Sequence, residues 1–157
     1  MNIYFLDESR FGLLPYQHPF ENFYLFGAYS PINANHFTLE LPACHTANFP
    51  LYLNEWAKQR SNELKIVCLD NGAFHHSRAL NLPDNIVLVF LPPYAPQRNP
   101  AEKIGRHLKD ALAKQLFKTL DELSDQLQVV IQQTRLPQTL ISITAYNYYI
   151  HAFNAIF

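Results

Sequence analysis

Two short apolar runs that each end on an aspartate constrain most strongly what this chain can fold into. Residues 3–7 are IYFLD and residues 66–70 are IVCLD, and in both runs the apolar side chains occupy successive positions. Strands that are apolar on both faces are typical of the middle of a covered, largely parallel sheet. Ligand sites in such sheets lie beyond the carboxyl ends of the strands, so Asp7 and Asp70 are candidate ligand residues.

The two aspartates are expected to lie close together. If their strands are neighbours, Asp7 and Asp70 lie about 4.8 Å apart at the backbone. Carboxylates at that distance repel by roughly 4 kcal/mol at an effective dielectric constant near 20, so they share a proton or bind a cation. A hard divalent ion with oxygen ligands suits them best, and Mg²⁺ is the obvious candidate. The alternative is that each aspartate forms a turn or caps the next element.

The run LPPYAPQRNPAE over residues 91–102 predicts a stiff connector followed by a helix. Each proline fixes its own φ and drives the preceding residue to extended backbone. Asn99 and Pro100 are predicted as the helix N-cap and the first helical residue, which makes Glu102 the third. Glu102 then either supplies a third carboxylate to the two aspartates, or closes a capping box and pairs with Arg106.

Composition and charge limit the classes of protein that the chain can represent. A length of 157 residues with 48% hydrophobic residues predicts one folded domain over residues 1–157. The formal net charge of −1 provides no overall attraction to nucleic acid. Two cysteines without C-x-x-C spacing argue against a disulfide framework or a zinc site. The start does not resemble a signal peptide and polar residues interrupt the apolar tail, so we expect a cytoplasmic protein without membrane contact.

The remaining sequence predicts further strands and four helices. Strands are expected at NFYLFGAYSP, HFTLELPA and NIVLVFL, with a turn at residues 33–35 between the first two. Helices are expected over residues 46–61 and 100–117, after the capping box TLDE at residues 119–122, and in the aromatic tail. The apolar stripe expected on the 100–117 helix is Ile104, Leu108, Ala111, Leu112 and Leu116. The residues that the tail helix is expected to present are Ile143, Tyr146, Ile150 and Phe153.

Three motifs occur in a fixed order along the chain: DES, LDNGAFH and LPPYAPQRNPAE, with 31 residues between Asp70 and Glu102. With this order and spacing the chain resembles the DDE superfamily of transposases, specifically the bacterial insertion-sequence branch of the mariner-like group. The similarity runs from Ile3 to about Gln128. The proline-rich series before the glutamate is its most specific part, whereas DES alone carries no signal.

The resemblance implies an α/β fold, an RNase H-like mixed sheet flanked by helices, with Asp7, Asp70 and Glu102 as a catalytic and metal-binding triad. In that family two Mg²⁺ or Mn²⁺ ions bridge such a triad. With these ions the enzyme nicks double-stranded DNA at the ends of an insertion element and transfers the cut strand into a target. Two ions about 3.5–4 Å apart stabilise both the attacking and the leaving oxygen of a phosphoryl displacement. The alternative is a catalytically inactive transposase remnant that serves at most as an interaction module.

Residues near the triad are assigned lesser roles. Asn71 either stabilises the turn after Asp70 or bonds a ligand carboxylate. His75 either lies beside the site or satisfies a helix start, and Asn99 positions the helix that carries Glu102. The residues expected against the DNA backbone are Arg98, Lys103, Arg106 and Lys109. Glu102, Gly105, Arg106 and Lys109 are expected to share one face of the helix, away from most of the apolar stripe. A solvated helix face is the alternative for these cations.

The chain also departs from the family in three places. Members usually carry an N-terminal helix-turn-helix module that binds the element ends, whereas this chain begins almost at the first catalytic strand. The loop at residues 13–21 is shorter than the region that helps to hold the dimer in relatives. Gly105 stands where members often carry a bulky aromatic residue. We therefore expect a separate helix-turn-helix partner, a homodimer as one candidate assembly, and either a split transposase or a decaying remnant.

Overall fold

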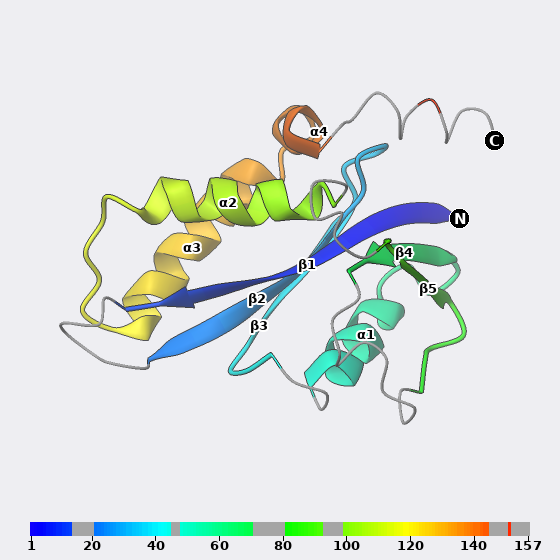
Figure 1. The fold of residues 1–157 in the computed structure, drawn as a ribbon, viewed down its shortest axis with the longest axis horizontal. Helices are drawn as coiled ribbons and strands as arrows, with labels where there is room; N and C mark the ends of the chain where they lie inside the picture. Colours follow the sequence, from blue (N-terminus) through cyan, green and yellow to red (C-terminus); the bar gives the residue numbers. More distant parts are fainter. Residues whose placement is uncertain (14–20, 45–47, 71–80, 93–98, 145–150, 152–157) are drawn as a thin grey trace.

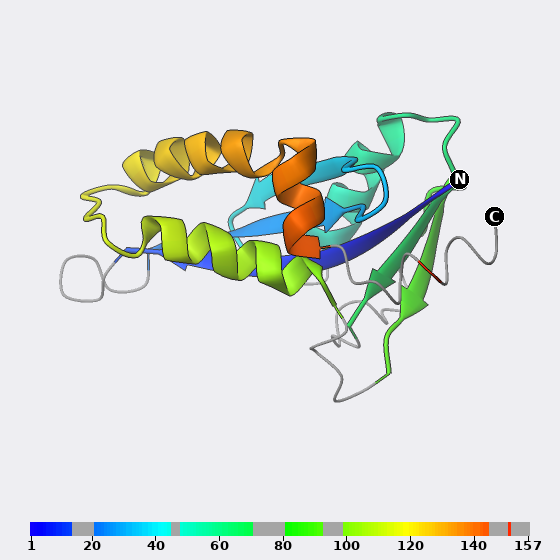
Figure 2. The same cartoon turned by 90° about the horizontal axis from the view of Figure 1, so that it is seen from above.

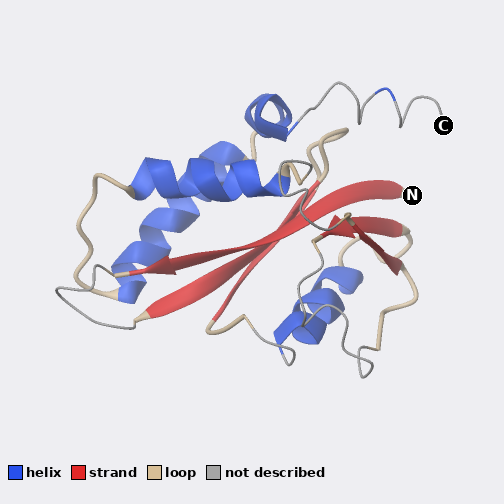
Figure 3. Ribbon diagram, viewed as in Figure 1, coloured by secondary structure: helices blue, strands red, loops and turns tan. Residues whose placement is uncertain are grey.

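The structure is a computed structural model, and its described residues are 1–13, 21–44, 48–70, 81–92, 99–144 and 151. Within them a five-stranded sheet has helices on both of its faces (Figure 1). Colouring by secondary structure shows the helices α2, α3 and α4 on one side of the sheet and α1 on the other (Figure 3). None of the described helices is both long enough and apolar enough to pass through a lipid bilayer.

The sheet has the strand order β3-β2-β1-β4-β5. Its strands are β1 (Asn2–Gly12), β2 (Asn22–Tyr29), β3 (His36–Leu41), β4 (Lys65–Leu69) and β5 (Ile86–Phe90). The pairs β1–β2 and β2–β3 are antiparallel, whereas β1–β4 and β4–β5 are parallel. The sheet is therefore mixed, as the resemblance implied, and not largely parallel, as the apolar runs alone predicted.

The central strand β1 extends beyond the aspartate at which the sequence predicted its end. After Asp7 it continues as an antiparallel ladder with β2, from the pair Asp7–Gly27 to the pair Gly12–Asn22. The polar sequence after Asp7 gives no strong strand signal, but β2 supplies hydrogen-bonding partners along this whole half of β1. Asp7 consequently lies inside a strand, where neighbouring backbone on the β2 side holds it firmly.

The helices are α1 (Asn48–Lys58), α2 (Ala101–Leu112), α3 (Leu120–Thr134) and α4 (Pro137–Thr144). Seen from above, α2 lies along β1, with α3 and α4 beside it on the same face (Figure 2). One core lies between the sheet and these three helices and includes Phe5, Ile104 and Leu127. A second core lies under α1 and includes Tyr4 and Trp56. The alternation of Tyr4 and Phe5 between the two cores explains why β1 is apolar on both faces.

Helix α2 is shorter than the sequence predicted. The stripe of Ile104, Leu108 and Leu112 is buried, as predicted. Ala111 is exposed and Leu116, which lies beyond the helix, is 74% exposed, so both are wrongly assigned to the stripe. The strand beneath α2 ends at Gly12, so a longer helix would have no sheet to cover, and the chain instead turns towards α3.

The capping box before α3 is present with one change of partner. Thr119 Oγ1 accepts a hydrogen bond of 3.2 Å from the backbone N–H of Glu122. The Glu122 carboxylate accepts from the N–H of Lys118 at 2.8 Å, one residue earlier than the usual capping box. In the tail, α4 buries Leu140 and Thr144. Ile143 is half-buried, and the other residues assigned to this helix, Tyr146, Ile150 and Phe153, fall outside the described part of the chain.

Candidate active site

The register between β1 and β4 brings the two candidate aspartates together. The strands are parallel neighbours, and their ladder reaches the pair Phe5–Cys68. The same offset places Asp7 opposite Asp70, which directly follows the end of β4. Neighbouring strands lie about 4.8 Å apart. The two strands are therefore neighbours, which is the condition under which Asp7 and Asp70 were expected to lie close together.

Asp7 lies on the sheet face that α2 covers. Alternate side chains of a strand share a face, and Phe5 and Phe11 both lie in the core beneath α2 and α3. A β-carbon on Gly105 of α2 would lie 3.4 Å from Oδ2 of Asp7. Helix α2 therefore passes directly beside this carboxylate, and Glu102, which is half-buried, lies one turn earlier on the same helix.

Asn99 connects the start of α2 to β1. Its Nδ2 donates a hydrogen bond of 2.8 Å to the carbonyl oxygen of Leu6, and its Oδ1 accepts one of 3.0 Å from the N–H of Ala101. The Asn99 side chain is buried, and Leu6 directly precedes Asp7. One side chain thus holds the first residue of the helix against the strand at the candidate aspartate.

The exact start of α2 differs by one residue from the prediction. The N-cap position is Pro100, not Asn99, so Glu102 is the second helical residue and not the third. Helix boundaries defined by different criteria commonly vary by one or two residues. Asn99 still satisfies a backbone N–H at the helix start, which is the function expected of an N-cap side chain.

The three acids lie within electrostatic range of one another. Burial is the largest cause of a rise in the pKa of Asp7 from 3.8 to about 7. The carboxylates of Glu8, Glu102 and Asp70, in that order, add to this rise. The pKa of Glu102 is also raised, by burial first and then by Asp70, while Arg106 opposes the rise.

A glycine on the other side of Asp7 makes room for a tyrosine. Gly27 is the cross-strand partner of Asp7, and a β-carbon on Gly27 would overlap the hydroxyl group of Tyr29. Burial raises the pKa of Tyr29 and the Asp7 charge raises it further, so this hydroxyl keeps its proton. Sequence reasoning missed both residues. The available signal is a glycine within the apolar strand, which indicates a close approach of another group.

The donor set suits a hard divalent cation. Carboxylate oxygens are the ligands that Mg²⁺ prefers, and the pKa of Asp7 is raised by burial first and then by the charges of the neighbouring carboxylates. Within the described ranges, however, no three His, Cys, Asp or Glu side chains are close enough to hold a metal ion. Asp7, Asp70 and Glu102 therefore interact electrostatically. In the described residues they do not form a complete set of metal ligands.

The other predicted site residues divide into two groups. Those that fall outside the described residues are Asn71, His75 and Arg98. Lys103 and Arg106 are exposed on α2, as a DNA-contacting role requires. The prediction that Gly105 lies on one face with Arg106 and Lys109, away from most of the apolar stripe, is wrong, because Gly105 is buried against β1.

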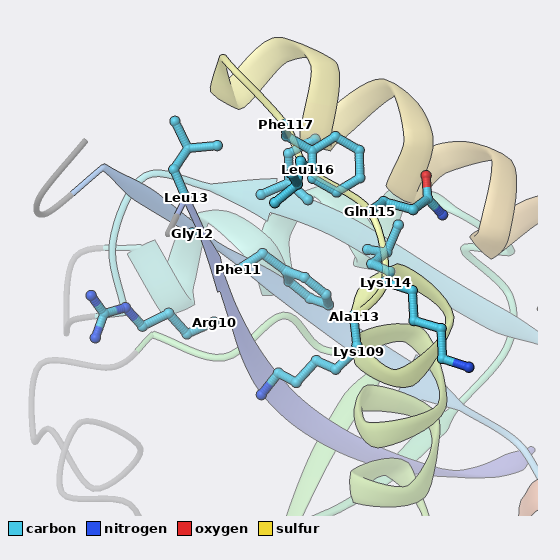
Figure 4. Close-up of a pocket in the computed structure, with 12 residues that line it drawn as sticks. Arg10, Phe11, Gly12, Leu13, Lys109, Ala113, Lys114, Gln115, Leu116 and Phe117 are labelled. Atoms are coloured by element: carbon cyan, nitrogen blue, oxygen red, sulfur yellow. The ribbon is translucent and has the colours of Figure 1, made fainter. Parts of the chain in front are cut away.

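A cavity of about 330 Å³ lies near the far ends of β1 and α2 (Figure 4). Lys109 is on its wall, with Nζ 5.9 Å from the centre of the Phe11 ring. Arg10 and Lys114 line the same cavity. Three cationic side chains therefore line one cavity together with apolar residues that include Phe11 and Leu112. Sequence reasoning missed Arg10 and Lys114 because they come from different elements that only the folded chain brings together.

Comparison with known proteins identifies the family. Residues 13–124 match the family described as "DDE superfamily endonuclease". The chain belongs to this superfamily. The matched segment contains Asp70 and Glu102, while Asp7 lies before it. A relative from Sinorhizobium fredii, called "Uncharacterized protein y4pE/y4sA", is 33% identical over 102 residues, which are 64% of this chain and 76% of the relative.

Solved structures confirm the fold of this DDE superfamily member. A chain of the Mos1 transposase paired-end complex with left transposon end matches with a TM-score of 0.63 and 16% identity, over 92% of this chain and 56% of that chain. A chain of the simian T-cell lymphotropic virus intasome in complex with PP2A regulatory subunit B56 gamma matches with a TM-score of 0.54 and 13% identity, over 80% and 46%. This chain thus spans about half of each solved chain, and the RNase H-like mixed sheet is confirmed.

Proposed function

We propose that this DDE superfamily domain is the catalytic domain of a transposase, which nicks double-stranded DNA at insertion-element ends and transfers the cut strand to a target. The observation that carries the proposal is the register that places Asp7 opposite Asp70, with the helix bearing Glu102 packed beside Asp7. Metal ions would bring together three carboxylates, one from β1, one from the residue that follows β4 and one from α2. Oxygen donors in this arrangement suit phosphoryl transfer assisted by metal ions.

Each residue of the triad would contribute differently. Asp7, Asp70 and Glu102 would hold Mg²⁺ or Mn²⁺, as two ions, which when bound would activate the attacking water and neutralise charge on the phosphoryl group. The backbone of Asp7 is held in place because this residue lies inside β1 and pairs with β2. Glu102 comes from the helix that Asn99 holds against β1. Firm support of this kind matters because about 1 Å of misplacement can lower a rate 10²-fold.

DNA would contact the cationic side of α2. Lys103, Arg106 and Lys109 lie along this helix, and Arg10 and Lys114 join Lys109 at the cavity. Phosphate contacts of this kind give affinity without sequence preference and fall steeply with salt. Selection of the element ends would therefore come from a separate helix-turn-helix part, in a monomeric or homodimeric assembly.

An inactive transposase remnant remains the second candidate function. It is favoured by one observation: the part of the chain that the structure describes contains no complete group of metal ligands. An intact Asp7, Asp70 and Glu102 set favours the active enzyme, since drift without selection has no reason to preserve those three acids.

A nicking assay separates the two candidates. Supercoiled plasmid that carries the DNA flanking the coding sequence is incubated with the protein and millimolar Mg²⁺ or Mn²⁺. We expect open-circular product with the wild-type chain and none with Asp70→Asn or with a chelator. A wild-type chain that produces no nicks with either ion, with or without a helix-turn-helix partner, would support the remnant.

A further inference from the structure

Helix α2 approaches β1 more closely than two ordinary side chains would allow. Gly105 is buried, and a β-carbon at this position would overlap Oγ of Ser9. The same β-carbon would lie 3.4 Å from Cβ of Ser9, which is an ordinary van der Waals contact. The Ser9 hydroxyl, and not the strand itself, is therefore the group that excludes a side chain at position 105.

Glycine within a helix needs such a reason. It destabilises a helix interior relative to alanine, because it has greater backbone freedom in the unfolded chain. Gly105 lies near the middle of α2 with no positive φ that would require glycine. The close contact with Ser9 is the feature of the described structure that accounts for it.

Three contacts hold α2 along β1, and they occur in the same order along the helix and along the strand. Asn99 bonds the carbonyl of Leu6, Gly105 lies against Ser9, and Lys109 lies over the Phe11 ring. The helix and the strand run side by side in the same direction (Figures 1 and 2).

The two candidate acids lie among these contacts. Glu102 is one helical turn before Gly105, and residues three apart are neighbours on a helix surface. Asp7 is two residues before Ser9, on the same face of β1. A change in the spacing between residues 9 and 105 would therefore change the spacing between the two acids.

We propose that the Ser9–Gly105 contact sets the separation between α2 and β1 and thereby positions Glu102 relative to Asp7. Ser9 and Gly105 are positioning residues and need not touch metal or DNA. The inference rests on the proposed function only for the role of the two acids, because the spacing itself is a property of the metal-free fold.

A set of four proteins tests this contact: wild type, Ser9→Ala, Gly105→Ala and the double variant. In metal-free buffer we expect Gly105→Ala to lower the melting temperature by several degrees. We expect Ser9→Ala to melt close to wild type. The double variant should regain the wild-type melting temperature, because removal of Oγ leaves room for the new methyl group. A double variant that melts as low as Gly105→Ala would overturn the proposed contact.

A second measurement separates positioning from general stability. Asp7→Asn and Glu102→Gln are introduced singly and together into each of the four backgrounds, and the non-additive part of their melting-temperature shifts is measured without metal. We expect this coupling in wild type and in Ser9→Ala/Gly105→Ala, and its loss in Gly105→Ala. Equal coupling in all four backgrounds would show that the contact serves stability alone and would overturn the positioning role.

The same proteins distinguish this inference from the proposed function. Mn²⁺ affinity, measured by electron paramagnetic resonance, should fall at least tenfold in Gly105→Ala and recover in the double variant. If wild type itself binds no Mn²⁺, the proposed function fails, while the metal-free coupling still decides the positioning role. If Gly105→Ala does not fold, Ser9→Thr places an additional methyl group in the same contact from the strand side. We expect this variant also to reduce the coupling between Asp7 and Glu102.

Discussion

The side-chain amide of Asn99 donates a 2.8 Å hydrogen bond to the carbonyl oxygen of Leu6, 93 residues earlier in the chain. This bond joins the residue just before the N-cap of α2 to the strand residue that precedes Asp7. It is fully buried, and the same side chain accepts from the N–H of Ala101. The start of the helix therefore depends on one amide that bonds the strand and the helix at once.

Replacement of Asn99 should destabilise the protein measurably. In Asn99→Ala the Leu6 carbonyl and the Ala101 N–H both lose their side-chain partner, which costs about 1–3 kcal/mol per buried unsatisfied group. Asn99→Asp keeps an acceptor for Ala101 but faces a carboxylate towards the Leu6 carbonyl, so we expect a loss at least as large. Urea unfolding measures both, with the exposed Asn62→Ala as control. A loss below 0.5 kcal/mol in Asn99→Ala (about the error of such comparisons) would contradict this role.

The free energy of unfolding of the metal-free protein should fall as the pH rises from about 4 to about 7. Folding raises the pKa of Asp7 from 3.8 to about 7, so the native state binds a proton that the unfolded state has released. Stability is then complete below the unfolded pKa and decreases until the folded pKa is passed, by at most about 4 kcal/mol.

Asp7→Asn tests this pH dependence directly. The amide acquires no charge as the pH rises, so the variant should be more stable than wild type at pH 8 and should lose the part of the decline between pH 4 and 7 that Asp7 causes. Urea unfolding at four pH values measures the effect, and the exposed Asp110→Asn on α2 is a suitable control. Parallel pH profiles of wild type and Asp7→Asn would show that Asp7 is not the residue responsible.

How far the sequence predicts the fold depends on the kind of contact. The positions of all five strands follow from short apolar runs, and the places of β1 and β4 inside the sheet follow from their being apolar on both faces. The start of α3 at Thr119 follows from local capping chemistry. These features depend on neighbouring residues or on burial alone, which the sequence shows directly.

The features that sequence reasoning missed depend on contacts between distant elements. The extension of β1 past Asp7 requires β2 as a partner, and nothing in the local sequence of β1 indicates it. The helical pattern predicts Gly105 on a face away from most of the apolar stripe, because the pattern cannot show how closely α2 approaches Ser9. The position of Tyr29 beside Asp7 likewise depends on the cross-strand register with Gly27.

Arg10 and Lys109 should contribute to DNA affinity through phosphate contacts. Each substitution by glutamine should weaken binding to any DNA sequence and reduce the dependence of log affinity on log salt by about one per lost contact. Fluorescence anisotropy at several salt concentrations measures the slope. Lys58→Gln, which changes an exposed cation on α1, is the control. If the control and the two variants reduced the slope equally, DNA would not contact this face specifically.

Direct titration with Mn²⁺ tests most directly whether Asp7, Asp70 and Glu102 form one metal site. Electron paramagnetic resonance of free Mn²⁺ gives the affinity of wild type, Asp7→Asn, Asp70→Asn, Glu102→Gln and the control Glu55→Gln on α1. We expect each triad variant to bind at least tenfold more weakly than wild type, a loss of about 1.4 kcal/mol, and the control to bind as wild type does. Wild-type affinity in all three triad variants would contradict the shared site, and so would the absence of Mn²⁺ binding by the wild-type chain.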